Sequence, residues 1–238
     1  MVLARAMSHS TLQWAVGASL AALLTLTACS PIYGAAGSAP VAAPVIDNPK
    51  AAGPMQTAVI AAGCFWGVQG VFEHVRGVQK AVSGYSGGSK RTAEYGTVSS
   101  GMTGHAESVM ITFDPAQISY GQILQIAFSA VHDPTELNRQ GPDLGTQYRS
   151  AIFYTDPEQR RIAESYIAQL NQAHAFARPI VTQVAPLEGF YPAEDYHQDY
   201  LVRHPSAPYI AFNDLPKVEN LKREFPDLYT AQPVLAER

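Results

Sequence analysis

The stretch TAVIAAGCFWGVQGVFEHV, residues 57–75, decides the fold of this chain. Its first six residues form a short apolar run of the kind found in buried strands. Gly63 ends that run, and apolar residues then recur at helical spacing on one face as far as Val75. The stretch therefore predicts a strand that leads directly into a helix, with Cys64 at the junction.

Cys64 combines features that suit a nucleophile. The free N–H groups and partial positive charge of a helix N-terminus favour a thiolate, and they predict a lowered pKa for this cysteine. Gly63 and Gly67 allow the backbone to approach closely, and Phe65 and Trp66 supply a flat apolar wall. The combination indicates attack on an apolar, polarisable group. The alternative is a buried structural cysteine.

Outward from this junction, strand and helix patterns alternate without internal repeats. The patterns predict strands at 78–85, 107–113, 149–154 and 180–185, and helices at 119–131, from 156 onward and at 193–202. Ser119 and Gln122 have capping-box spacing, which fixes one helix start. The interleaved order predicts an α/β or α+β sandwich, with the charged residues after Asp214 at its periphery.

Composition excludes several classes of function. The 238 residues are 47% hydrophobic and 15% charged, as in a globular protein with a substantial core. With 16 basic and 20 acidic side chains, the chain has no basic excess for nucleic acid. Two cysteines cannot build a disulfide framework or an all-cysteine zinc site. The seven histidines are scattered, and we expect no metal. His105 and Glu107 are the only close pair with ligand character; His105 and His197 are expected to support the site or to pack.

The N-terminal sequence is typical of a targeting signal. The apolar run 14–26 is too short to span a bilayer, but it suits the core of a signal peptide. It ends in Leu26-Thr27-Ala28-Cys29, which resembles the lipobox of bacterial lipoproteins. This predicts a lipid on Cys29 and a periplasm-facing protein of the cell envelope, with the outer membrane favoured. The alternative is a buried N-terminal helix in which Cys29 is a small hydrophobe.

The motifs of the folded region resemble those of the A-type peptide methionine sulfoxide reductases. The matching blocks are Gly63-Cys64-Phe65-Trp66-Gly67, Gly84-Tyr85-Ser86-Gly87-Gly88, Thr103-Gly104-His105-Ala106-Glu107, residues 138–150 and residues 193–200. They cover about residues 57–213 in family order. The resemblance implies a two-layer sandwich with a ferredoxin-like core, in which a mixed sheet is flanked by helices.

This resemblance and the N-terminal pattern together divide the chain. We expect a signal peptide at 1–28, then a lipidated cysteine and a flexible Ala/Pro/Gly tether over 29–56. The catalytic domain is expected at 57–213. A C-terminal extension, 214–238, follows it and contains no resolving cysteine.

The resemblance also implies a role for each matched residue. Cys64 would attack the sulfoxide sulfur, and Glu107 would protonate the sulfoxide oxygen if burial raises its pKa. Tyr85 and Tyr148 would hydrogen-bond that oxygen as it leaves.

Four further residues would bind the substrate according to the resemblance. Phe65 and Trp66 would hold the S-methyl group and exclude water. Asp143 would hold a backbone amide of the substrate, although by itself it reads as a turn residue. Tyr200 would belong to the pocket wall.

The chain departs from the family pattern in how the oxidised Cys64 would be reduced again. Many members carry resolving cysteines near the C-terminus, but here the corresponding stretch reads Pro208-Tyr209-Ile210. We therefore expect no bound cofactor and an external reductant, which would be a thioredoxin-like protein, a glutaredoxin-like protein or a small thiol. The expected substrates are oxidised proteins or peptides containing methionine sulfoxide, and the expected state is a monomer.

Two other functions remain open from the residues alone. A lone activated cysteine could serve a thiol peroxidase, which would not need the Phe65-Trp66 pocket. A non-catalytic lipoprotein could bind Met-rich partners through the same aromatic pocket.

Overall fold

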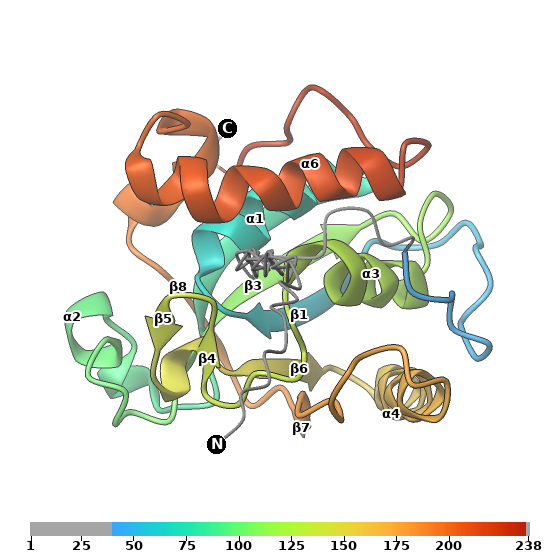
Figure 1. Cartoon of the computed structure of the whole chain (residues 1–238), viewed down its shortest axis with the longest axis horizontal. Helices are drawn as coiled ribbons and strands as arrows, with labels where there is room; N and C mark the ends of the chain where they lie inside the picture. The colour runs from blue at the N-terminus through green and yellow to red at the C-terminus, as the bar shows by residue number, and fades with distance from the viewer. Residues whose placement is uncertain (1–39, 237–238) are drawn as a thin grey trace, which may run out of the picture. The chain divides into compact units, whose positions relative to one another are not determined.

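A computed structural model describes residues 40–236 of the chain (Figure 1). The predicted signal peptide, Cys29 and the first part of the tether lie outside the described residues. No helix within the described range is long and apolar enough to cross a membrane.

The centre of the fold is a six-stranded sheet in the order β7-β6-β1-β3-β2-β8. Its strands are β1 (Gln56–Ala62), β2 (Val78–Ser86), β3 (Ala106–Phe113), β6 (Ser150–Tyr154), β7 (Gln183–Pro186) and β8 (Phe190–Pro192). The β6–β7 pair is parallel and the other pairs are antiparallel. A separate hairpin joins β4 (Arg139–Gln140) to β5 (Asp143–Leu144).

Four strands of this sheet, β1, β2, β3 and β6, form a ferredoxin-like core. β1 and β2 both run antiparallel to β3, so they are parallel to each other and need a crossover helix. That helix is α1 (Phe65–Glu73), and α3 (Tyr120–Ile126) makes the second crossover, from β3 to β6. The order β6-β1-β3-β2 confirms the expected mixed sheet flanked by helices.

The helices that cover the sheet lie on one of its faces. Alternate residues of β1, namely Ala58, Ile60 and Ala62, share the main core with α1, α3 and α4 (Pro157–Gln172). The helix α6 (Leu215–Glu224) lies beside α1 on the same side of the molecule (Figure 1). The short helices α2 (Tyr95–Val98) and α5 (Tyr200–Arg203) complete the set within residues 40–236.

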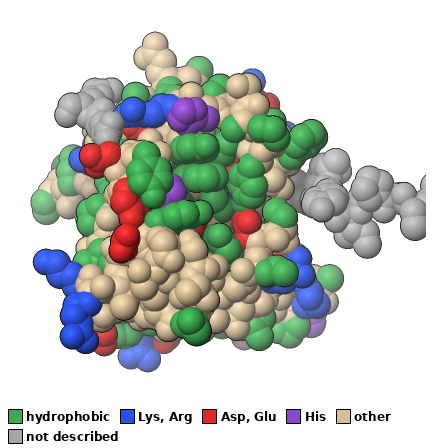
Figure 2. Space-filling view, turned by 90° about the vertical axis from the view of Figure 1, so that its left-hand side faces the viewer, with side chains coloured by type: hydrophobic (Ala, Val, Ile, Leu, Met, Phe, Trp, Pro, Cys, Tyr) green, Lys and Arg blue, Asp and Glu red, His purple; other side chains and the backbone are tan. Residues whose placement is uncertain are grey.

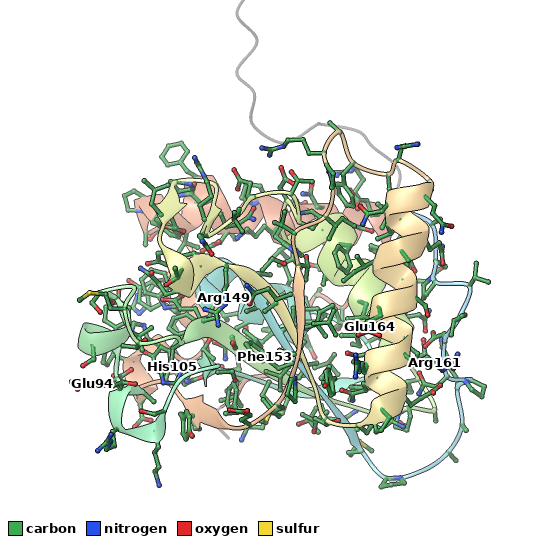
Figure 3. All side chains as sticks on the ribbon, turned by 90° about the horizontal axis from the view of Figure 1, so that it is seen from below. Glu94, His105, Arg149, Phe153, Arg161 and Glu164 are labelled. Atoms are coloured by element: carbon green, nitrogen blue, oxygen red, sulfur yellow. The ribbon has the colours of Figure 1, made fainter. Side chains whose placement is uncertain are left out.

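The opposite face of the sheet carries a smaller apolar cluster and a large hydrogen-bonding side chain. Phe153 is buried there with Val59 of β1. The Arg149 guanidinium donates to the carbonyls of Gly104 at 2.8 Å and His105 at 3.0 Å (Figure 3). Arg149 therefore holds the loop that leads into β3.

Residues 41–48 differ from the flexible tether that composition predicts, because they dock on α3 and α4. The Tyr166 hydroxyl donates to the Ala42 carbonyl at 2.8 Å. Asp47 accepts hydrogen bonds from the Ser119 hydroxyl and, at 2.8 Å, from the Gly121 N–H. The first turn of a helix has free N–H groups, and a carboxylate placed there satisfies them and complements the helix dipole.

The C-terminal residues are also more deeply embedded than predicted. Asp214, Val218 and Leu221 are buried, so the expectation of a peripheral segment is wrong. Glu219, Lys222 and Arg223 of α6 are exposed, whereas its apolar residues recur at helical spacing towards α1 and Lys217 is largely buried. Beyond it, Thr230 and Val234 donate backbone hydrogen bonds to the carbonyls at the end of α1.

Candidate active site

Cys64 occupies the N-cap position of α1, directly after β1. Gly63 turns the chain there with φ of +89°, and a side chain at this position would meet Gln140 at 2.6 Å. Glycine is therefore required both for the backbone conformation and for the close approach of the β4 strand. The Cys64 side chain is only 7% exposed and forms no disulfide. The sequence prediction that Cys64 opens the first helix is confirmed.

Glu107 reaches the same place from β3, where it lies opposite Tyr85 of β2. Its Oε2 atom accepts a hydrogen bond from the Phe65 N–H at 3.0 Å, and the residue is 3% exposed. Burial raises the pKa of Glu107 to about 8; the Phe65 N–H opposes that rise, whereas Asp143 and Asp214 add to it. Glu107 is thus a carboxylic acid at neutral pH. A single hydrogen bond joins it to Phe65, the residue that follows Cys64.

The pKa of Cys64 is not lowered as the sequence predicts. Burial, together with Glu107 and Asp214, raises the pKa of this thiol well above its usual range. Lys217 and the Trp66 N–H lower it, but by less. The helix N-terminus does not outweigh these effects, because Glu107 already accepts the Phe65 N–H and because the thiol is buried.

Aromatic side chains form the wall of the site. Trp66 stacks on Tyr200 at a centroid distance of 4.0 Å and meets Tyr209 edge-on at 5.9 Å. Its indole N–H donates to Nδ1 of His197 at 3.1 Å, which fixes the ring orientation. Phe65 contacts Tyr85 at 5.8 Å. Tyr200 therefore lies against Trp66, one of the side chains that the resemblance assigns to substrate binding.

The predicted polar groups differ in how strongly they are engaged. The Tyr85 hydroxyl donates to Oε2 of Glu194 at 2.9 Å, and burial raises the pKa of Tyr85. The Tyr148 hydroxyl has no hydrogen-bond partner among residues 40–236, and its pKa is also raised, first by burial and then by Glu107. Asp143 accepts a hydrogen bond from the Tyr209 hydroxyl. Tyr148 is therefore the readier donor for a ligand.

The surface around the site is apolar. Figure 2 shows the side of the molecule that carries α2, β5 and β8, where hydrophobic side chains gather across the centre beside several carboxyl groups. Leu144 follows Asp143 in the chain, and Tyr196 precedes His197; both are exposed, as is Phe212. Leu144 and Tyr196 are thus exposed apolar side chains next in the chain to two residues of the site, and we call them its apolar rim.

His105 packs inside the loop that precedes Glu107. Its Nε2 atom lies 3.0 Å from the Ser89 carbonyl oxygen, and the ring occupies the space beside Gly88. Among the described residues, no group of three or more His, Cys, Asp or Glu side chains is arranged to hold a metal. His105 therefore orders the loop that carries the acid.

Comparison with known proteins decides the family. A model of the peptide methionine sulfoxide reductase family matches residues 56–228. The peptide methionine sulfoxide reductase MsrA 2 of Mesorhizobium japonicum is 60% identical over 186 residues, which is 78% of this chain and 95% of the relative. MsrA 2 of Synechocystis is 52% identical over 79% of this chain and 90% of its own length. The chain belongs to this family.

Two solved structures of methionine sulfoxide reductases share the fold. Methionine sulfoxide reductase A of Corynebacterium diphtheriae superposes with a TM-score of 0.57 at 34% identity, covering 70% of this chain and 88% of that one. The reduced form of Mxr1 from Saccharomyces cerevisiae gives a TM-score of 0.58 at 29% identity, covering 66% and 91%.

Several residues of this methionine sulfoxide reductase site were not predicted from its sequence. They are Glu194, His197 as the Trp66 partner, Tyr209, Asp214 and Lys217. Glu194 and His197 stand inside a matched block, so that block could have indicated them. Asp214 and Lys217 lie beyond the matched blocks in a segment whose charges suggested the surface.

Proposed function

We propose that this methionine sulfoxide reductase reduces the S epimer of methionine sulfoxide, free or in peptides, through nucleophilic attack by Cys64 with Glu107 as the acid. One observation carries this proposal: a buried carboxylic acid, protonated at neutral pH, is hydrogen-bonded to the first residue of the helix that Cys64 opens. One reductase class serves each sulfoxide epimer, and the A-type family serves the S epimer.

The step needs both a soft nucleophile and a proton. The Cys64 sulfur attacks the sulfoxide sulfur, and Glu107 protonates the oxygen, which is a poor leaving group without that proton. The sulfoxide S–O bond breaks, the oxygen is transferred to the Cys64 sulfur as a sulfenic acid, and the bond between the two sulfurs breaks as methionine leaves. The proton that the thiol loses replaces the one that Glu107 gives, so sulfoxide and thiol become sulfide and sulfenic acid without net proton uptake.

The remaining groups orient the substrate. Phe65 and Trp66 would hold the methyl group, and the stack of Trp66 on Tyr200 keeps that wall in place. Tyr148 would donate to the sulfoxide oxygen, whereas Tyr85 can do so only by releasing Glu194. Asp143 would accept from a backbone amide of the substrate, and the exposed apolar rim suits oxidised protein segments.

A single assay tests this function and its alternatives. The purified full chain, with dithiothreitol, is given a peptide with either epimer of methionine sulfoxide, or hydrogen peroxide. We expect methionine from the S epimer alone and none from Cys64→Ser. Reduction of the R epimer only would contradict the assignment. Peroxide turnover without sulfoxide reduction would favour a thiol peroxidase, and binding without turnover would favour a Met-peptide-binding lipoprotein.

We propose that the cycle uses one cysteine and an external thiol. Cys64 is the only cysteine in the described part of the chain, and the sequence has just one other, Cys29. A thioredoxin-like or glutaredoxin-like protein, or a small thiol, would attack the sulfenic acid. That attack would release water and leave a mixed disulfide on Cys64. A second thiol would then break the mixed disulfide, which leaves the reductant oxidised as a disulfide and restores the Cys64 thiol.

We also propose that Cys29 carries a lipid and anchors the protein in the cell envelope, facing the periplasm. The lipobox-like sequence after an apolar run supports this proposal, and Ser30 after the cysteine favours the outer membrane. There it would repair oxidised envelope proteins. Cys29→Ala should release the protein from the membrane fraction, and unchanged fractionation would contradict the anchor.

A further inference from the structure

A buried ion pair lies against the first turn of α1. Asp214 precedes α6 and is fully buried, and its Oδ1 atom lies 2.9 Å from the Lys217 ammonium. A side chain at Gly67 would meet Asp214 Oδ1 at 2.1 Å and Lys217 Nζ at 2.8 Å. The pair therefore occupies the space that Gly67 leaves open, three residues along the helix from Cys64.

Stabilising the fold does not by itself explain this buried ion pair. Taking two charges out of water costs more than their attraction returns unless every polar atom is satisfied. The Oδ2 atom of Asp214 is buried and has no hydrogen-bond partner among residues 40–236. An unpaired carboxylate oxygen in such a place calls for a role in the chemistry beside it.

The charge of Asp214 acts on the reacting groups of the site. It raises the pKa of Cys64 and of Glu107, and its effect on Cys64 exceeds the opposite effect of Lys217. Burial raises the pKa of Asp214 itself, and the Lys217 ammonium at 2.9 Å opposes that rise.

Other titratable groups also face Cys64. They are Glu107 on β3, Tyr95 on α2, Tyr148 before β6 and Tyr209 before the π-helical turn Ile210–Asp214, while Asp143 on β5 faces Glu107. Within residues 40–236, Asp214 and Lys217 are the charged pair that enters the site from the C-terminal segment.

We propose that Asp214 is a positioning residue that keeps two protons in the resting site, one on the Cys64 sulfur and one on Glu107, until a sulfoxide binds. This inference rests on the proposed function. A thiolate exposed to peroxide would form a sulfenic acid without a substrate, and further oxidation to the sulfinic acid is irreversible. The proton on Glu107 is the one that the departing oxygen needs.

The first test measures Cys64 directly in the full chain. Asp214→Asn keeps the shape and an acceptor for Lys217 but removes the negative charge. The rate of Cys64 alkylation by iodoacetamide is followed against pH by mass spectrometry of its peptide. We expect the midpoint to move to lower pH in this variant. The alkylation rate at pH 7 should rise by roughly threefold for each pH unit by which the midpoint falls, since the thiolate fraction grows faster than its nucleophilicity falls. Glu219→Gln, which removes an exposed charge from α6, should leave the midpoint unchanged.

The second readout is the pH profile of single-turnover sulfoxide reduction. Without the Asp214 charge the pKa of Glu107 falls, so the alkaline limb should move to lower pH while the acidic plateau persists. A variant that merely loosens the site would lose reduction at every pH, and this result would overturn the proposal.

An alkylation midpoint equal to that of the wild type, in a folded Asp214→Asn protein, would also overturn it. If that variant does not fold, Asp214→Asn combined with Lys217→Met must give a smaller shift in the same direction. Failure of the wild type to reduce sulfoxide would refute the proposed function, whereas the alkylation comparison would still decide what Asp214 does to Cys64.

Discussion

Glu107 keeps its proton because its carboxyl group is buried between β2 and the first turn of α1, with one N–H to bind it. A carboxylate in this place would need more donors than the Phe65 N–H supplies. The same burial keeps water from the leaving oxygen. Protonation of Glu107 and exclusion of water therefore have one structural cause.

The pH dependence of the chemical step follows from this carboxyl group. The reacting form is protonated Glu107, so the single-turnover rate should fall as pH rises through about 8. Glu107→Gln keeps the shape but has no proton to give, so it should lower the rate at pH 6 by about 10²–10⁴-fold and remove this limb. Rapid-quench measurement of methionine formed in one turnover checks both effects.

Glu164→Gln is the matched control, since this residue lies on the exposed side of α4 (Figure 3). Its rate and pH profile should equal those of the wild type. A Glu107→Gln variant with wild-type single-turnover rates would show that another group supplies the proton.

At the residue scale, the sequence indicated the groups carried by compact motifs. Cys64, Trp66 and Glu107 were found because their neighbours are distinctive. Asp214 and the raised pKa of Cys64 were not found, because they depend on how the C-terminal segment packs on α1. The position of a cysteine at a helix N-terminus predicts that the helix lowers its pKa. It does not predict whether burial raises that pKa by more.

Among the elements, the docked segment 41–51 is the least expected. It crosses α3 and α4 through side chains that accept from or donate to its backbone, and Ala51 donates to the Pro115 carbonyl at 3.1 Å. Asp47 adds a cap at the start of α3. Residues 41–51 therefore do not belong to the flexible tether that composition predicts.

The Asp47 cap should contribute measurably to stability. Asp47→Ala removes the acceptor of the Gly121 N–H and of the Ser119 hydroxyl, and it should lower the free energy of unfolding by about 1–2 kcal/mol. Urea unfolding of the full chain measures this change. Asp227→Ala, an exposed control, should cost less than about 0.5 kcal/mol. Equal stabilities for the two variants would mean that the segment is not docked in solution.

The long elements were predictable from periodicity, and the short ones were not. β1 and β3 have clear apolar patterns, α4 has a clear pattern and an Asp156 N-cap, and the Ser119 capping box predicted for α3 is present. α2 has four residues and β4 has two, which is too few for any period to show. α6 carries apolar residues at helical spacing, but its charged outer face concealed the buried side.

At the scale of the whole molecule, α1 links two buried acidic sites. Cys64 and Glu107 lie at its start, and Glu73 lies buried at its end against Asp199, with neither Glu73 oxygen reached by a donor. Burial, and then Asp199, raise the pKa of Glu73 to about 9. Asp199 in turn accepts from the Ala236 N–H at 2.8 Å, which ties the C-terminal segment to this end of the helix.

Stability should therefore decline with rising pH. The folded state holds a proton on Glu73 that the unfolded chain loses near pH 4.5, so this contribution falls between about pH 4.5 and about 9. Glu73→Gln should reduce the drop in melting temperature between pH 6 and pH 8.5. Glu188→Gln, at an exposed site, should leave the drop as in the wild type. The same pH dependence in all three proteins would contradict a protonated Glu73.

The central claim about the whole catalytic cycle is that Cys64 receives the sulfoxide oxygen and that no second cysteine forms a disulfide with it afterwards. The direct measurement is one turnover of the full chain with an S-epimer methionine sulfoxide peptide, without thiol and with dimedone present. Mass spectrometry then compares methionine formed with modification of the Cys64 peptide. We predict one dimedone adduct on Cys64 for each methionine formed. Methionine produced while Cys64 stays unmodified, or a disulfide between Cys29 and Cys64, would contradict the account.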